Sequence, residues 1–273
     1  DSAIVPTFII SEKARDLGVK VMLTGAGGDE IFGGYARHHQ RKFGSAAWLS
    51  ALPKFIKGFL FLPFYFFNKS LFWRLSNPQN NFLFSISGVN VELLRQCSKN
   101  KKHYEILLDS FLESFKDSKS SDSYSKMKLD VKNYLHNNVL SLTDKATMAA
   151  SVEGRVPLLD HHLAELSFKI PEQINLLNGV EKSLFKYSVK DLISKDIMDR
   201  KKDGFNAPVF SWIESWKELI EQEISFNITP ELNEVIDVKV VKRWLNDINL
   251  RSQSAETLYS IYILNLWIRK HRI

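Results

Sequence analysis

The sequence predicts a mostly helical α/β protein that carries only a remnant of a parallel sheet. Gly and Pro together make up 20 of the 273 residues, or about 7%. Their average share in proteins is roughly 12%, so this composition favours helices. One convincing strand, VKVMLT at 19–24, is followed by a glycine-rich loop and another helical pattern. Because a parallel sheet needs several strands joined by crossover connections, we expect the rest of the sheet to lie outside these residues.

The remaining elements follow in chain order. Pro6 suits a first helical turn and Gly18 a helix end, so a helix is expected before the strand. Tyr104–Phe115 has a helical pattern, and the polar stretch Lys116–Lys128 is expected to be a solvated loop. Two later stretches repeat apolar residues at helical spacing, which predicts core-facing helices: Trp212, Ile213, Trp216, Leu219 and Ile220, then Leu258, Ile261, Tyr262, Leu266 and Trp267.

Composition bounds the class of protein. The chain has 44% apolar and 25% charged residues, a composition that excludes a disordered chain. The single Cys97 cannot form an internal disulfide, so we expect a reducing, cytoplasmic setting. The chain opens at Asp1 without a signal-peptide pattern, and we expect it to be a piece of a longer protein. The net charge of +6 is mild and predicts no nucleic-acid partner.

The first segment that could carry chemistry is TGAGGDE, Thr24–Glu30, between the strand and the next helix. A backbone with few side chains can approach a phosphate closely at such a place. Asp29 then offers a hard oxygen ligand, and Mg²⁺ on nucleotide phosphates usually takes one or two protein carboxylates. The same residues are also compatible with a plain tight turn. Short glycine motifs often occur without any ligand.

Two further segments interleave charges with small and apolar residues. Asp144–Asp160 contains three carboxylates and two cations, which predicts a polar group entering a packed region, either as an ion-pair network or around a ligand. Asp199–Pro208 is a basic loop before a Trp-rich helix. Cations on a loop can neutralise a pyrophosphate, although such a run is also typical of solvated surface.

In this order, the three segments resemble the C-terminal synthetase domain of the glutamine-dependent asparagine synthetases. The family pattern is similar to S-G-E/D-G-x-D-E-L-F-G-G-Y, D-R-x-S-M-A-x-S-x-E-x-R-V-P-F-L-D and K-x-G-F-x-x-P, which correspond here to Thr24–Tyr35, Asp144–Asp160 and Lys202–Pro208. The resemblance covers nearly the whole chain, and three ordered segments are far more specific than one.

The resemblance implies an adenine-nucleotide α-hydrolase-like (ATP pyrophosphatase) fold. It implies a nucleotide-binding α/β layer at 1–45, a variable aromatic-rich helical subdomain at 46–125 and the helical part of the synthetase domain at 126–273. The reaction it implies is ATP-dependent amidation of aspartate through an aspartyl adenylate, with Mg²⁺ on the phosphates and ammonia from glutamine.

The resemblance also implies residue roles. Asp29 would hold the metal, while Thr24 and Gly25 would contact ATP. Gly27 and Gly28 would keep the loop open to phosphate. Three residues would be catalytic: Lys202 facing pyrophosphate and the charge of the intermediate, Glu153 handling the proton of the attacking amine, and Arg155 as its partner. A homodimer is compatible with the sequence but not required by it.

Several positions depart from the family pattern. Ala26 stands where the family carries an acidic residue associated with forming the aspartyl adenylate, and its methyl group can neither pair with an amine nor accept a proton. The acyl substrate is therefore left open. Thr24 and Lys145 keep the hydroxyl and the charge of the family residues, and Gly154 falls at a position without a constraint in the pattern.

Two parts of the family are absent from the sequence. Neither the S-G-G-x-D-S pyrophosphate loop nor the N-terminal glutaminase cysteine occurs, and Cys97 is expected to be an inert thiol. The isolated chain is therefore expected to be inactive, which ATP hydrolysis by the purified 273 residues would contradict.

The sequence allows three other interpretations. GGDEIF at 27–32 resembles the signature of diguanylate cyclases, but the other two segments have no place there. β-Lactam synthetases and lasso-peptide cyclases resemble this domain and close a ring on an adenylated carboxylate, and Ala26 favours them as the alternative. The acid-free, aromatic-rich segment 31–91 predicts a helical cap, or else a face against anionic membrane. Prolines and lysines interrupt its apolar stretch 46–67, so no spanning helix is expected.

Overall fold

The computed structural model describes residues 1–39, 91–113, 123–177, 180–198, 200, 204–205 and 207–271, and most of them are helical. They divide into two compact units. The first holds the described residues of Ala3–Ser50 and Phe115–Ala207, and the second those of Ala51–Ser114 and Pro208–Ile273. The three-part division expected from the sequence stays a prediction.

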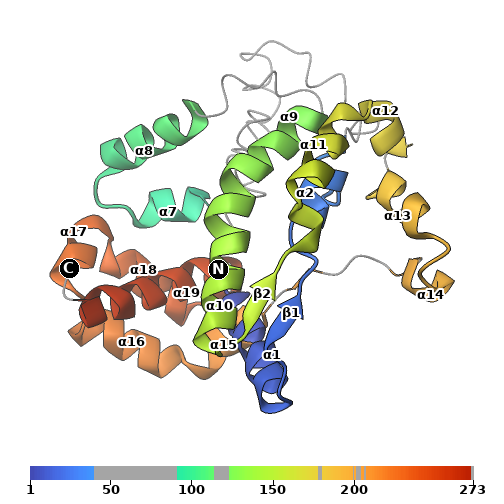
Figure 1. Ribbon diagram of the computed structural model, residues 1–273. Coiled ribbons are helices and arrows are strands. Elements are labelled where there is room, and N and C mark those ends of the chain that lie inside the picture. The colour runs from blue at the N-terminus through green and yellow to red at the C-terminus, as the bar shows by residue number, and fades with distance from the viewer. Residues whose placement is uncertain are drawn as a thin grey trace, which may run out of the picture. The chain divides into compact units, whose positions relative to one another are not determined.

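The first unit contains a two-stranded parallel sheet (Figure 1). Strand β1 (Val21–Leu23) pairs with β2 (Glu153–Arg155), with Met22 opposite Gly154. The expectation of a single strand was therefore wrong: the second strand consists of two charged residues around a glycine, a composition that β-propensity does not favour. The predicted α/β class with a remnant of a parallel sheet is confirmed.

Helix α1 (Ile4–Asp16) precedes β1 and packs against α10 (Ser141–Ala149). It ends as predicted at Gly18, whose φ of +81° lies in the left-handed region. The Gly18 N–H donates to the Arg15 carbonyl and the Val19 N–H to the Ala14 carbonyl, which is the Schellman arrangement of a helix end. This turn directs the chain from α1 into β1.

One long helical segment covers one face of the sheet (green in Figure 1). It runs without a break through α9 (Ser123–Leu129), the π-helix η1 (Asp130–Leu140) and α10. The expectation of a loop up to Lys128 was wrong from Ser123 onward. Met127 and Leu129 are buried, and their packing stabilises the helix although the surrounding residues are polar. Residues 116–122 of that expected loop lie outside the described residues.

Short helices follow β2 in the first unit. They are η2 (Pro157–Leu159), α11 (His161–Lys169), α12 (Glu172–Asn175), α13 (Ser183–Val189) and α14 (Lys195–Met198). Helix α2 (Gly28–Phe32) contacts α9, η1, α11 and α13. The ring of Phe32 stacks on Phe185 at 4.9 Å between centroids, which joins α2 to α13.

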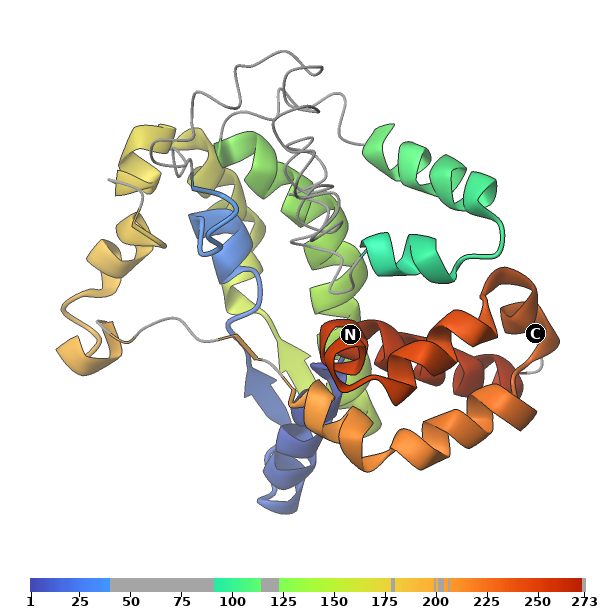
Figure 2. The ribbon, with the colours of Figure 1, turned by 180° about the vertical axis from the view of Figure 1, so that it is seen from behind.

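The second unit is helical in its described part. It comprises α7 (Val91–Cys97), α8 (Lys101–Glu113), α15 (Val209–Ser215), α16 (Lys217–Phe226), α17 (Pro230–Val235), α18 (Val238–Asn246) and α19 (Ile248–His271). Figure 2 shows α16, α18 and α19 side by side in orange to red. Ile213, Ile220 and Leu258 are buried as predicted, whereas Leu219 and Trp267 are about half exposed.

Most of the acid-free segment 31–91 lies outside the described residues, so the cap and the membrane-face interpretations stay predictions. Within the described residues, no helix is both long and apolar enough to cross a membrane.

Candidate functional site

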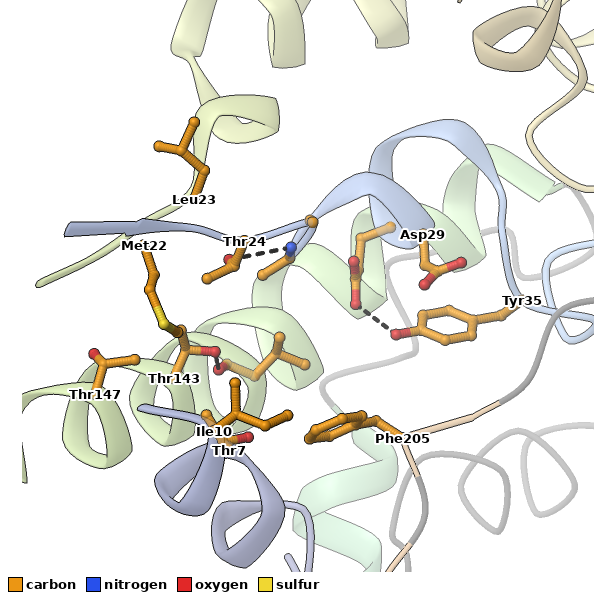
Figure 3. A pocket seen from close by; sticks show the side chains of 15 residues that line it. Thr7, Ile10, Met22, Leu23, Thr24, Asp29, Tyr35, Thr143, Thr147 and Phe205 are labelled. Carbon is orange, nitrogen blue, oxygen red and sulfur yellow. Dashed lines mark hydrogen bonds between the residues drawn. The ribbon is translucent and has the colours of Figure 1, made fainter. Parts of the chain in front are cut away.

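A pocket of about 420 Å³ opens beside the carboxyl end of β1 (Figure 3). Met22 points into it together with Ile10 of α1, while Leu23 points to the opposite face of the sheet. Its wall comes from α1, β1, the glycine loop, η1 and α10, and is formed by Thr7, Ile10, Met22, Leu23, Thr24, Gly25, Ala26, Gly27, Asp29, Glu30, Tyr35, Val139, Thr143, Thr147 and Phe205. Pockets at the carboxyl ends of parallel strands are the usual ligand sites of such sheets.

The glycine loop is fixed to the second strand. The Thr24 N–H donates to the Arg155 carbonyl at 2.8 Å, and the Thr24 hydroxyl accepts from the Ala26 N–H at 3.4 Å. A Cβ at Gly25 would meet nothing within 4 Å, so the backbone of Gly25 is open to a ligand.

The next two glycines have a packing role. Gly27 has a φ of +88°, and a Cβ there would overlap the Leu159 side chain. A Cβ at Gly28 would lie 2.8 Å from Leu158 Cδ1. These glycines therefore let the turn after β2 pack directly under the loop, and Gly28 does not line the pocket.

Gly154 is sterically constrained as well. A Cβ there would lie 3.0 Å from Thr147 Oγ1 and 3.1 Å from its Cγ2. The position that looked unconstrained in the sequence therefore sets how closely β2 approaches α10.

Asp29 forms an ion pair at the pocket wall. Lys182 Nζ lies 2.9 Å from Asp29 Oδ1, and both side chains are partly exposed. Lys182 has a φ of +54°, unusual for a residue with a side chain. Among the described residues, no group of three His, Cys, Asp or Glu side chains is arranged to hold a metal. Asp29 is thus a partly exposed carboxylate at the pocket wall that is paired with a cationic side chain.

Glu30 lies deeper in the same wall. Its residue is 1% exposed, and Oε1 accepts a hydrogen bond from the Tyr35 hydroxyl at 2.9 Å. Burial raises the pKa of the Glu30 carboxyl, and the nearby Asp29 and Asp130 add to the effect. Burial also raises the pKa of Tyr35, so its hydroxyl keeps its proton.

A buried network holds Tyr35 in place. The Arg37 guanidinium lies 3.8 Å from the centroid of the Tyr35 ring and 5.0 Å from that of Tyr134. Arg37 Nε donates to Asp130 Oδ2 at 2.7 Å, and His38 Nε2 lies 2.5 Å from the same oxygen. Burial lowers the pKa of His38, although Asp130 opposes the shift. Arg37, which covers the Tyr35 ring, is thus itself held in place by Asp130.

Threonine hydroxyls line the other side of the pocket. Thr7 donates to the Ala3 carbonyl and Thr143 to the Val139 carbonyl, each at 2.8 Å, and Thr147 donates to the Asp144 carbonyl at 3.2 Å. A hydroxyl that donates to its own helix retains acceptor lone pairs. This wall can therefore accept hydrogen bonds from a neutral or cationic ligand.

The structure separates the predicted site residues. Thr24, Gly25, Gly27 and Asp29 line one pocket. Glu153 and Arg155 project from the other face of the sheet, where Arg155 Nε donates to Glu153 Oε1 at 2.9 Å. This contact lowers the pKa of Glu153 and raises that of Arg155. Lys202 lies outside the described residues.

The sequence gives no role to two pocket residues, Glu30 and Tyr35, or to Lys182, which pairs with the pocket residue Asp29. Lys182 lies in no predicted segment, and Glu30 and Tyr35 belong to the first block of the resemblance without receiving a role. The spacing of Glu30 and Tyr35, five residues across a glycine pair, was the available signal. Nothing in the sequence indicates that Lys182 pairs with Asp29.

Comparison with known proteins supports the resemblance. The family model described as asparagine synthase matches residues 1–269. Asparagine synthetase [glutamine-hydrolyzing] 1 of Bacillus subtilis (strain 168) is 27% identical over 276 residues, covering 97% of this chain and 39% of that protein. A putative asparagine synthetase [glutamine-hydrolyzing] of Mycobacterium tuberculosis (strain ATCC 25618 / H37Rv) is 27% identical over 279 residues, covering 98% and 42%. The chain thus spans about two fifths of the length of these relatives.

Proposed function

Because the chain belongs to the asparagine synthase family, we propose that it forms the main part of the synthetase site of an enzyme that makes asparagine from aspartate. The observation that carries this proposal is the pocket beside β1, where the glycine loop and Asp29 line one cavity. The relatives are more than twice as long as the aligned segment, so the activity belongs to the whole protein.

The proposed reaction has two steps. An oxygen of the aspartate side-chain carboxylate attacks the α-phosphorus of ATP, the bond to pyrophosphate breaks, and aspartyl-AMP forms. Ammonia then attacks the acyl carbon and AMP leaves, with the amine proton passing to a base. The protein must hold the reactants close together and stabilise the charge that develops at phosphorus and carbon.

ATP is proposed to lie along the glycine loop. The open backbone of Gly25 and the Thr24 hydroxyl face the pocket and suit contacts to the nucleotide. Gly27 shapes the loop through its left-handed conformation, and Gly28 supports it through its packing on Leu158.

Asp29 is proposed to hold Mg²⁺. Its single, partly exposed carboxylate fits a metal that takes most of its ligands from phosphates and water. When bound, the ion neutralises phosphate charge. Lys182 pairs with Asp29 in the structure. When the metal occupies Asp29, the Lys182 ammonium group would pair with a phosphate oxygen of the nucleotide instead.

Three catalytic assignments stay proposals. Lys202 would meet the pyrophosphate and the charge of the intermediate, Glu153 would take the amine proton, and Arg155 would hold Glu153. The Glu153–Arg155 contact supports the last of these roles, although both side chains lie on the sheet face opposite the pocket.

Further parts of the protein are proposed to complete the site. Val21 and Leu23 are 38% and 74% exposed on the sheet face that carries Glu153 and Arg155. Additional strands would extend the sheet at its edges, and the helices that connect them would cover this face. A pyrophosphate loop would complete the site, and a glutaminase part would supply the ammonia. Cytoplasmic location and a homodimer belong to the same proposal.

One feature favours a second function. Ala26 presents a methyl group to the pocket where the family pattern carries an acid. A related synthetase of the β-lactam synthetase or lasso-peptide cyclase type, which joins an adenylated carboxylate to an amine of the same molecule, is therefore the alternative.

The test is aspartate-dependent exchange of labelled pyrophosphate into ATP by the full-length gene product. Exchange that requires aspartate supports the proposal, and asparagine formation from ammonium separates it from ring closure. A folded protein that binds ATP but gives no exchange with aspartate would refute it.

A further inference from the structure

We propose that Glu30 is the carboxylate that binds the ammonium group of the amino-acid substrate, and that it thereby selects amino-bearing acids over amine-free ones. This inference rests on the proposed function. It adds a substrate-binding residue that the sequence alone does not single out.

The charge of the pocket points to a cationic group in the ligand. Its described wall contains two carboxylates, Asp29 and Glu30, and no Lys, Arg or His. A buried carboxylate is stable only when its charge is paired or hydrogen-bonded. Glu30 has the Tyr35 hydroxyl as its hydrogen-bond donor, and no ion pair to Glu30 is found among the described residues.

The other acidic groups near the pocket have charged partners. Asp29 pairs with Lys182 at 2.9 Å. Glu153 pairs with Arg155 on the opposite face of the sheet and does not line the pocket. Ala26 has no charge to offer. Glu30 is therefore the carboxylate of the described pocket wall that remains for an ammonium group.

The surroundings fix the direction of the Glu30 carboxylate. Tyr35 engages Oε1, and a carboxylate has lone pairs beyond that one bond. The Tyr35 ring is covered by Arg37, which Asp130 holds in turn. A preorganised acceptor loses little freedom when a ligand binds, which is what selective recognition requires.

Paired substrates test the inference in the full-length protein. Pyrophosphate exchange and equilibrium binding in the presence of ATP would be measured with aspartate and with succinate, which differ by the amino group. The wild type is expected to prefer aspartate. Glu30→Gln should raise the half-saturating aspartate concentration by about tenfold or more, the scale of one lost charge-assisted hydrogen bond. Its succinate values and its ATP affinity should stay unchanged.

Two further variants keep the test informative. Glu165→Gln removes an exposed carboxylate of α11 in the same unit and should change neither substrate. Ala26→Glu placed in the Glu30→Gln protein supplies a carboxylate from the neighbouring loop and should restore part of the preference for aspartate.

The outcomes separate the two proposals. If neither acid supports exchange, the proposed function fails, and the Glu30 assignment is judged from binding alone. Equal binding of aspartate and succinate by the wild type would overturn the assignment, as would an aspartate preference that survives in a folded Glu30→Gln protein.

Discussion

Lys182 Nζ lies 2.9 Å from Asp29 Oδ1, and it does so from a backbone conformation that L-residues rarely adopt. The pair joins the helix that follows the glycine loop to the turn before α13. It brings together one residue expected at a metal site and one that the sequence did not single out.

Replacing Asp29 tests its proposed role at the metal. In Asp29→Asn, the gain in ATP affinity on adding Mg²⁺ should largely disappear, because the amide carries no charge to attract the cation. Calorimetric titration with ATP at several Mg²⁺ concentrations measures this, with Glu165→Gln as the control. A Mg²⁺ dependence equal to that of the wild type would place the metal elsewhere.

The conformation of Lys182 has a separate effect on stability. Lys182→Gly and Lys182→Ala both remove the partly exposed ion pair, but only glycine adopts a φ of +54° without cost. The glycine variant should therefore be more stable than the alanine variant by about 1 kcal/mol. Urea unfolding of both proteins gives the difference, and equal stabilities would contradict the assigned conformation.

Two glycines of the loop should respond differently to alanine. Gly27→Ala meets both a positive φ and the Leu159 side chain, so a loss of about 1–3 kcal/mol is expected. Gly25→Ala meets nothing within 4 Å and should leave stability within about 0.5 kcal/mol of the wild type. If the nucleotide lies against the loop, Gly25→Ala should nevertheless weaken ATP binding. Unfolding curves and ATP titrations of the two variants would decide.

Glu30 should make stability depend on pH. Burial raises its pKa in the folded state, so its favourable contribution is complete below the unfolded pKa and is lost as the pH rises through the folded value. Glu30→Gln should therefore match the wild type near pH 4 and become the more stable protein as the pH increases. Unfolding free energies between pH 4 and 8 test this. If the wild type instead became more stable than the variant as the pH rises, folding would lower the pKa of Glu30 and not raise it.

Cys97 should be unreactive in the native protein. It is 1% exposed, and burial raises the pKa of its thiol to about 11. At pH 8 only about one thiol in a thousand is then ionised, and the thiolate is the reactive form. Mass spectrometry after iodoacetamide should find Cys97 unmodified in buffer and modified in denaturing urea. Rapid labelling in buffer would mean that α7 opens readily.

Prediction from sequence succeeded where the signal is local. The αL turn at Gly18, strand β1 and the apolar spacing around Ile213 and Leu258 each depend on neighbouring residues, and the structure confirms them. The resemblance to the asparagine synthetases, which the family match confirms, rests on the order of three local segments.

It failed where the cause is distant in the chain. Strand β2 exists because Glu153–Arg155 pairs with a strand near the start of the chain, and none of its three residues has a strong preference for a strand. The Lys182–Asp29 pair likewise depends on tertiary packing. Glu30 was visible in the sequence, but only its burial and the Tyr35 contact distinguish it from an ordinary helix residue.

The contact between Gly27 and Leu159 limits how this site can change in evolution. Any side chain at position 27 would occupy space that Leu159 already fills, so the two positions cannot vary independently. A smaller residue at 159 would have to appear first, and the glycine loop would lose its support in the interval. Among natural relatives, a side chain at position 27 is therefore expected only where position 159 carries a residue smaller than leucine.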